Sequence, residues 1–411
     1  MEVVNKRCCG LDVHKRVVVC CIMIREEGKV TKEIRSFGTM TSDLLVLHDW
    51  LKAHGVTHVA MESTGIYWKP VYNLLEDDFE VLLVNAAHVR NVPGRKTDVK
   101  DCEWIAELLS HGLLKGSFIP PRPIRDLRDL TRYRKSLTDE RIREVNRLQK
   151  FLESANIKLS SVATDIMGAS GRAMLQALLH GSTDPNILAD LAKGRLRKKL
   201  PLLRQALEGR FRPHHRFLLE QILSHLDFLD ESIERMSEEV TRRTGPFVEE
   251  IELLKTIPGV EQRVAETIVA EVGVDMERFP THRHISAWTG ICPGNNESAG
   301  KRKSGKVRKG NKWLKRTLVE SAWAASQTKE TYLSAQYHRL VRRRGKKRAA
   351  VAVGHTVLVI AYCLLRYKTA YQELGSDYFD RINIVHTTKH FVRRLEGLGY
   401  KVNLEPASIA A

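Results

Sequence analysis

The sequence lacks the cysteine spacing that zinc sites and disulfide frameworks use. None of its seven cysteines belongs to a CxxC pair, and the adjacent ones lie inside apolar, strand-like runs. Small buried thiols in a reducing compartment explain this distribution best. We therefore expect neither a zinc site nor disulfides. The cysteines are Cys8, Cys9, Cys20, Cys21, Cys102, Cys292 and Cys363.

Apolar runs long enough to cross a membrane are also missing. The N-terminus is charged, and the run Val17–Ile24 is too short for a signal peptide that leads to export. The longer run Ala349–Leu365 contains Gly354, His355 and Thr356, and it falls short of the roughly 20 residues that a bilayer requires. We predict that this run forms a buried core helix and that the protein is cytosolic, without a membrane partner.

Acidic residues are scarce in one long stretch. Residues 301–348 contain 17 Lys or Arg but two acids, within a chain of formal net charge +18 and pI near 9.6. A solvated surface normally mixes both signs, so this excess indicates a polyanionic partner, nucleic acid before an acidic membrane. We predict phosphate contacts from Lys301, Arg302, Lys303, Lys306, Arg308, Lys309, Lys312, Arg342, Arg343, Arg344, Lys346, Lys347 and Arg348.

Length and composition predict a folded chain of two or three domains. Apolar residues make up 43% of the sequence, which argues against intrinsic disorder. The 411 residues exceed the roughly 100–200 of one typical domain. Pro120, Pro121 and Pro123 interrupt helix or strand continuation. We predict domains at 1–123, 124–243 and 244–411, of which the first is α/β and the others are mainly α-helical.

The first domain has an alternating pattern of strands and helices. β-branched runs bounded by polar residues predict three successive strands, and Thr41 or Ser42 is expected to cap the helix that follows. The predicted order βββαβαβα matches an RNase H-like fold, although a generic α/β domain can have it too. The strands are expected at Arg7–Val13, Val17–Ile24, Val30–Phe37, His58–Met61 and Phe79–Val84, with later helices at Tyr67–Leu75 and from near Thr97.

A heptad pattern marks the middle of the chain. Residues 124 to about 159 read as a charged helix, and a second segment carries apolar residues spaced alternately three and four apart. Such spacing favours a coiled-coil seam, against a second copy or against the first long helix, or else an ordinary bundle helix. The spaced residues are Leu219, Ile222, Leu226, Leu229, Ile233, Met236 and Val240.

Four carboxylates are candidates for a metal site. Asp12 and Glu62 lie near the ends of predicted strands, which would place them side by side. Asp98 and Asp101 are three residues apart, so a helix presents both on one face. Converging carboxylates repel one another unless a cation lies between them, and hard oxygen ligands suit Mg²⁺ or Mn²⁺, which in turn bind phosphate oxygens.

Two features precede the basic stretch. Thr256–Val260 and the apolar residues after it resemble a helix-hairpin-helix, in which Gly259 lets backbone N–H groups approach a DNA phosphate, although a packing turn has the same pattern. Ser298 lies between glycines in what we expect to be a flexible loop. A serine nucleophile needs a base or metal and nearby positive charge. From the residues alone, Ser304 is an equally good candidate.

These motifs together resemble one family: the insertion-sequence transposases with a RuvC-like DEDD domain and a C-terminal serine transposase domain, described as bridge-RNA-guided recombinases. Within the one-ten/eleven-eleven group the chain is most similar to the eleven-eleven branch. The resemblance covers nearly the whole chain. The matching motifs are GLDVHK at 10–15, MESTGIYWKPV at 61–71, VPGRKTDVKD at 92–101, LRDLTRYR at 127–134, IPGV at 257–260, TGICPGNNESAGKRKSG at 289–305 and KGNKWLKRTL at 309–318.

The resemblance implies both a fold and a mechanism. It implies an RNase H-like N-terminal domain, a long helical coiled-coil middle and a mainly helical transposase domain. Asp12, Glu62, Asp98 and Asp101 would be the metal-binding DEDD set, and Ser298 would form a covalent phosphoserine link to DNA. The implied partners are Mg²⁺ or Mn²⁺, double-stranded DNA of the element ends and target, a bridge RNA, and further copies in a dimer to tetramer.

Two other functions fit the same residues. A RuvC-type junction endonuclease would use the metal cluster with water as the nucleophile, leaving Ser298 structural. A non-catalytic RNA- or DNA-binding protein would need the basic residues but not the acids.

Overall fold

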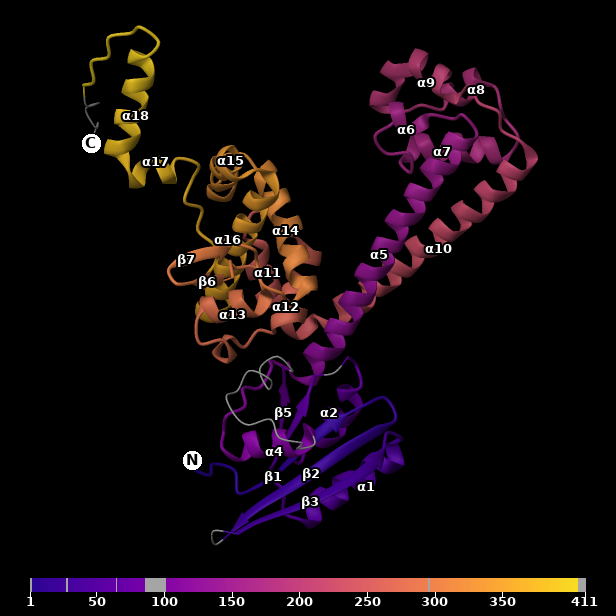
Figure 1. The fold of residues 1–411 in the computed structure, drawn as a ribbon. Helices are drawn as coiled ribbons and strands as arrows, with labels where there is room; N and C mark the ends of the chain where they lie inside the picture. Colours follow the sequence, from indigo (N-terminus) through magenta and orange to yellow (C-terminus); the bar gives the residue numbers. More distant parts are fainter. Residues whose placement is uncertain (1, 27–28, 64, 86–100, 295, 406–411) are drawn as a thin grey trace. The chain divides into compact units, whose positions relative to one another are not determined.

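The computed structural model divides into two compact units, Met1–Ile119 and Pro120–Ala411 (Figure 1). The division lies at the prolines that were expected to end the first domain. The second unit contains both the long helices of the middle segment and the helices after residue 243, so a separate third domain stays a prediction. The described residues are 2–26, 29–63, 65–85, 101–294 and 296–405.

The first unit is built on a five-stranded mixed sheet in the order β3-β2-β1-β4-β5. β1, β2 and β3 form an antiparallel meander, while β4 pairs parallel with both β1 and β5. All five predicted strands are present, which confirms the α/β class of this unit. The strands are β1 Arg7–Val13, β2 Val17–Glu26, β3 Lys29–Gly38, β4 His58–Glu62 and β5 Glu80–Val84.

Helices cover both faces of this sheet. α1 (Thr41–Ala53) and α2 (Trp68–Leu75) share one core with the odd-numbered side chains of β1 and β4. α4 (Asp101–Ser110) packs on the opposite face. The predicted cap of the first helix was wrong: Met40 is the N-cap residue, and no side chain caps the helix. The start predicted near Thr97 lies outside the described residues.

Two long helices open the second unit as an antiparallel hairpin. They are α5 (Arg122–Ser154) and α10 (Pro213–Arg243). Antiparallel pairing follows from the ion pairs, which join Asp126 to Arg243 and Arg141 to Asp230. Leu229 and Ile233 of the heptad pattern pack on Leu137 of α5. The heptad face of α10 is therefore covered by α5 of the same chain, as one of the predicted alternatives has it.

Small helices cap the far end of this hairpin (Figure 1). They share a core with the ends of the two long helices, to which Leu148, Leu152, Leu219 and Leu223 contribute. The polypeptide between α5 and α10 thus forms a compact cap with its own buried side chains. Its elements are α6 Leu159–Val162, α7 Ala169–Leu179, α8 Pro185–Asp190, η1 Gly194–Lys199 and α9 Leu200–Leu207.

The rest of the second unit is mainly helical around α16 (Lys346–Tyr367). By length and composition α16 could cross a membrane, yet 56% of its apolar window is buried against neighbouring helices. The predicted core helix is thereby confirmed. The other elements are η2 Gly245–Phe247, α11 Val248–Lys255, α12 Gln262–Val272, η3 Met276–Arg278, α13 His282–Thr289, β6 Asn296–Ser298, β7 Lys301–Ser304, α14 Lys312–Gln327, α15 Tyr332–Arg344, α17 Tyr378–Ile382 and α18 Ile384–Glu396.

Candidate functional site

Asp12 and Glu62 lie next to each other at the carboxyl ends of two parallel strands. Leu11 of β1 is paired with Met61 of β4, so the two acids occupy the following position on each strand. Leu11 and Met61 point into the core beneath α1 and α2. Because side chains alternate along a strand, Asp12 and Glu62 project from the opposite face, which α4 covers.

A glycine allows α4 to approach this face closely. A Cβ on Gly10 would lie 2.2 Å from the carbonyl oxygen of Cys102 and 2.5 Å from the backbone nitrogen of Ala106. No other residue type fits such a contact. The motif at residues 10–15 therefore needs its glycine to seat the helix that begins with Asp101.

The direction of α4 brings Asp101 to the same end of the sheet. Before β1 begins, the Asn5 side-chain amide donates to the carbonyl of Leu109 near the end of α4 (2.8 Å). The helix therefore runs antiparallel to β1, and its first residue lies toward the Asp12 end. Burial raises the pKa of the Cys102 thiol to about 11, and the negative charge of Asp12 acts in the same direction.

The acids face a partly exposed space rather than the core. The Asp12 side chain is 25% exposed, and its Oδ2 lies 3.1 Å from Nε2 of His14. Asp98 lies outside the described residues. Within the part of the chain that is described, no group of three or more His, Cys, Asp or Glu is arranged to hold a metal. The all-oxygen character of Asp12, Glu62 and Asp101 nonetheless fits a hard divalent cation.

Ser298 ends the first strand of a short β-hairpin. β6 pairs antiparallel with β7, and Ser298 lies opposite Lys301. The two residues between them, Ala299 and Gly300, have φ values of 50° and 73°. Two successive positive φ angles are the signature of a tight hairpin turn. The expected flexible loop was thus wrong for this segment, because paired strands hold the serine backbone beside the turn.

Ser304 occupies the other end of the hairpin. It is paired with Asn296, and its Oγ accepts a hydrogen bond from the backbone N–H of Lys306 (3.2 Å). This hydroxyl therefore stabilises the chain where the hairpin ends. The two candidate serines that the sequence left equal differ in place: Ser298 adjoins the turn and Ser304 is at the base.

Contacts between glycines fix the base of the hairpin to the helices around it. A Cβ on Gly290, which has φ +70°, would lie 2.8 Å from the carbonyl oxygen of Arg308. A Cβ on Gly310 would lie 2.5 Å from the carbonyl oxygen of Thr289. The two chain segments that enter and leave the hairpin region therefore touch backbone to backbone, and only glycine permits this at either position.

Gly259 lies in the tight connection between α11 and α12. It has φ +81°, and a Cβ there would meet the backbone nitrogen of Ala325 at 2.5 Å and the carbonyl oxygen of Ser321 at 2.6 Å. Packing of this turn against α14 explains the glycine, as the alternative interpretation of the sequence had it. A phosphate contact at Gly259 stays a prediction.

Most of the predicted phosphate-binding side chains are exposed. Three end α15 and three begin α16, separated by Gly345, and others flank the hairpin. None of the described ones forms an ion pair with a described acid, whereas Arg316 in the same stretch pairs with Asp139 and Glu320. The exposed side chains are Lys301, Lys306, Arg308, Lys309, Lys312, Arg342, Arg343, Arg344, Lys346, Lys347 and Arg348.

A buried carboxylate joins α5 to the C-terminal helices. Glu271 of α12 is fully buried, and both its oxygens accept hydrogen bonds from Arg132 of α5 (2.7 and 2.8 Å). The Asn311 amide also donates to Glu271 (2.5 Å), while its carbonyl oxygen caps α14 by accepting from Trp313 and Leu314 N–H groups. Burial lowers the pKa of the adjacent Arg128 to about 10, against the opposing charge of Glu271.

Removing Glu271 should destabilise the second unit strongly. Glu271→Ala leaves Arg132 and Arg128 without their carboxylate partner, and breaking a buried ion pair from one side costs roughly 3–5 kcal/mol. The free energy of unfolding in urea measures this loss. Glu239→Ala is the matched control, because Glu239 of α10 pairs with two arginines at the surface. Equal stability losses in the two variants would contradict the role assigned to burial.

Models of known families match both the region of the strand-end acids and the region of the serine hairpin. A transposase family model whose name specifies a DEDD transposase of IS110 type matches residues 9–157, the segment with the acids. A second model, described as transposase IS116/IS110/IS902 family, matches residues 251–338, which contain the hairpin. Both matched segments are thus similar to transposases of the IS110 family. These matches support the family expected from the sequence motifs, while the bridge RNA and the serine chemistry stay predictions.

Two individual relatives agree with this family. The chain is 24% identical over 381 residues to the transposase for insertion sequence element IS1111A of Coxiella burnetii, an alignment that covers 88% of this chain and 90% of the relative. It is 26% identical over 328 residues to the y4pF/y4sB protein of Sinorhizobium fredii, covering 77% and 75% of the two chains.

Proposed function

We propose that this IS110-family transposase cuts and rejoins DNA through Ser298, assisted by a divalent cation at Asp12, Glu62, Asp98 and Asp101. One observation carries the proposal: the two family matches fall separately on the strand-end acids and on the serine hairpin. Taken alone, the acids could be solvated residues at strand ends, and the serine could be an ordinary residue of a β-hairpin. Their presence in one transposase chain favours a shared reaction on a DNA phosphate.

The acids are suited to bind a metal rather than to act alone. Asp12 and Glu62 project from one sheet face, and α4 presents Asp101 at the same end. Bound Mg²⁺ or Mn²⁺ would supply charge stabilisation for the scissile phosphate and would favour loss of the serine proton. Asp12 also has His14 as a neighbour, which can hold the carboxylate in place by hydrogen bonding.

The serine chemistry balances as an exchange of phosphate esters. Ser298 Oγ forms a bond to phosphorus, the bond from phosphorus to one deoxyribose oxygen breaks, and that oxygen leaves as a hydroxyl with the proton. Attack by a sugar hydroxyl of another strand reverses the step and releases the serine. Each step exchanges one phosphodiester for another, so rejoining needs no energy source.

The exposed cations contribute positioning and charge. The backbone of Lys301 pairs with that of Ser298 in the hairpin, and the Lys and Arg side chains at the α15–α16 junction have no acidic partner among the described residues. Backbone phosphates of double-stranded element ends and target are the partners that such a surface attracts. Sequence choice would then rest on a bridge RNA, as the family resemblance implies.

Assembly into a dimer or tetramer is part of the proposal. The heptad residues of α10 already pack against α5 in one chain, for example Leu229 and Ile233 on Leu137. A contact between copies must therefore use other surfaces of the hairpin or other elements.

Trapping of the intermediate tests the mechanism. The purified protein is incubated with element-end DNA, the flanking RNA and Mg²⁺, denatured, and examined for DNA covalently attached to a peptide containing Ser298. We expect a phosphoserine adduct that forms only with a divalent cation. Cleaved DNA without an adduct would instead indicate water as the nucleophile, as in the junction-endonuclease alternative. Binding without cleavage would indicate the non-catalytic one.

A further inference from the structure

The cap at the far end of the α5–α10 hairpin contains a cavity that the transposition chemistry does not use. It has a volume of about 530 Å³ and lies between the α6–α7 connection and η1. This volume is in the range of roughly 300–1,000 Å³ that small-molecule sites occupy. Thr164 and Ser170 place hydroxyl groups at its wall, and Val162 and Leu196 add apolar surface.

The wall formed by η1 is strongly basic. Residues 193–199 contain five Lys or Arg and no acid. Across residues 160–212 as a whole there are nine Lys or Arg against four acids, so the excess is concentrated on this one turn. A surface that only keeps the cap soluble would mix both signs.

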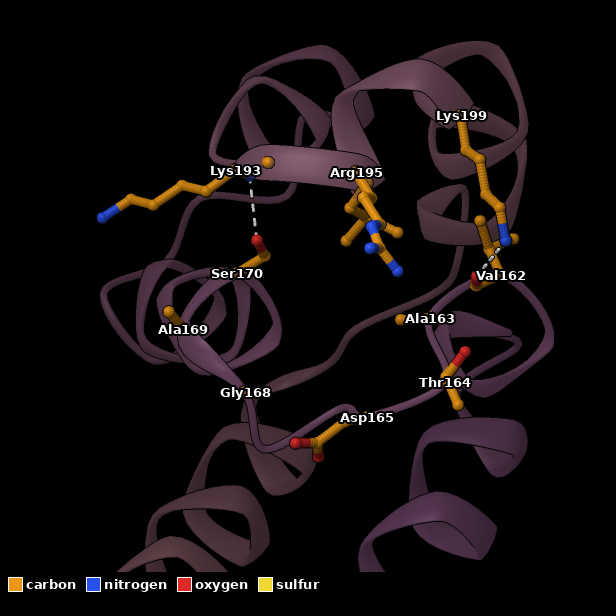
Figure 2. Close-up of a pocket in the computed structure, with 12 residues that line it drawn as sticks. Val162, Ala163, Thr164, Asp165, Gly168, Ala169, Ser170, Lys193, Arg195 and Lys199 are labelled. Atoms are coloured by element: carbon orange, nitrogen blue, oxygen red, sulfur yellow. Dashed lines mark hydrogen bonds between the residues drawn. The ribbon is translucent and has the colours of Figure 1, made fainter. Parts of the chain in front are cut away.

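Two of these cations are directed at the cavity. Figure 2 shows the Arg195 guanidinium extending from η1 into the space between the 163–165 segment and the start of α7. Arg195 has no ion pair or hydrogen bond with any described side chain, whereas Arg172 and Arg204 of the cap pair with Asp227 and Asp190. Lys199 ends η1, and its side chain extends to Val162, where its Nζ donates to the Val162 carbonyl (3.1 Å).

The remaining polar groups of the cavity are partly engaged. The Ser170 hydroxyl accepts a hydrogen bond from the backbone N–H of Lys193 (2.9 Å). One oxygen of Asp165 accepts from the Met167 N–H (2.9 Å), and the carboxylate lies beside Gly168 at the edge of the cavity (Figure 2), where it can accept from a hydroxyl or amine. An anion paired with a neutral hydrogen-bond donor satisfies this set better than a bare anion does.

We propose that this cavity binds one phosphodiester unit of a nucleic-acid strand. Arg195 and Lys199 contact the phosphate, Asp165 accepts from the attached sugar or base, and the apolar wall receives an unstacked base. The rim is open, because Thr164, Asp165, Lys193, Arg195 and Lys199 are all exposed, so a continuous strand can pass through it. The proposal concerns a second contact and does not depend on Ser298 or the acids.

Hydrogen exchange of the full-length protein gives a local measurement, which the basic stretch at 301–348 does not obscure. Backbone exchange in peptides covering 163–170 and 193–199 is followed with short single-stranded RNA, with single-stranded DNA of the same sequence, and with inorganic phosphate. We expect protection by one or both oligonucleotides at concentrations where inorganic phosphate has no effect. The better of the two identifies which strand chemistry the cavity takes.

A double variant tests whether binding depends on the side chains that line the cavity or only on the net positive charge of the cap. Arg195→Ala with Lys199→Ala should raise the oligonucleotide concentration needed for half protection by roughly tenfold or more, since each removes a charged hydrogen bond. Arg197→Ala with Lys198→Ala is the control, because it removes the same charge from the same turn at residues that do not line the cavity. All four side chains are exposed, so both variants should fold.

Three results would overturn the proposal: no protection of these peptides by either oligonucleotide, equal weakening in the two double variants, or protection by inorganic phosphate at the same concentration as by the strands. The last would make the cavity a free-phosphate site. The covalent adduct at Ser298 is measured separately, so failure here leaves the proposed transposition chemistry standing, and failure there leaves this site standing.

Discussion

Ser298→Ala is expected to abolish the covalent protein–DNA adduct and to reduce recombination by roughly 10⁴-fold or more, because loss of a nucleophile removes the chemical step itself. The adduct is measured on a denaturing gel with labelled element-end DNA, and recombination by amplification of the joined product. DNA binding should be unchanged, since the exposed cations around the hairpin remain in place.

Ser304→Ala is the matched control for this loss. It removes a hydroxyl from the same hairpin, but one that serves the backbone N–H of Lys306 at the base. A modest loss of activity from a looser hairpin is expected there, with the adduct still formed. If Ser304→Ala abolished the adduct and Ser298→Ala did not, the two serines would exchange roles. Retention of recombination in both variants would exclude serine chemistry.

The sequence was sufficient for the strands of the first unit. The run Val17–Ile24 combines β-branched residues with side chains that are buried or partly buried, and the structure extends that strand only to Glu26. Local composition decides such elements because both faces of the strand pack in one core or another. The acids at strand ends followed from the same pattern, since parallel neighbours end at one edge of the sheet.

The serine hairpin could not be predicted because its residues have little strand propensity. Asn296–Ser298 and Lys301–Ser304 are polar and short. What holds the region is distant in the sequence: the close contact of Gly290 with Gly310, each of which reads locally as an ordinary loop glycine. Local propensity reflects the loop-like composition of this segment but does not include the distant backbone that packs against it.

The buried ion pair between Arg132 and Glu271 could not be predicted from the sequence either. Arg132 and Glu271 are 139 residues apart in the sequence, and each alone reads as a solvent-exposed helix residue. The signal that was available is the spacing of Arg128 and Arg132, which places both on one helix face. This spacing predicts a basic stripe on α5, but it does not predict which buried carboxylate neutralises the stripe.

Asp12→Asn and Glu62→Gln should each reduce DNA cleavage and adduct formation by about 10³-fold, because a metal-bound transition state loses several kcal/mol of charge stabilisation. Neither substitution changes side-chain size appreciably. Binding of element-end DNA, measured by gel shift, should persist in both variants. Chelation of the divalent cation should stop the wild-type reaction in the same assay, and higher Mn²⁺ should restore part of the activity of the variants.

Glu80→Gln is the control that tests position rather than charge. Glu80 begins β5, at the opposite end of the same sheet, and its exposed carboxylate pairs with His58. The substitution removes one negative charge from the same unit without touching the end where Asp12 and Glu62 lie. Near-normal cleavage is expected. If Glu80→Gln were as damaging as Asp12→Asn, the acids would act through folding of the sheet. If Asp12→Asn cleaved normally, they would hold no metal needed for the reaction.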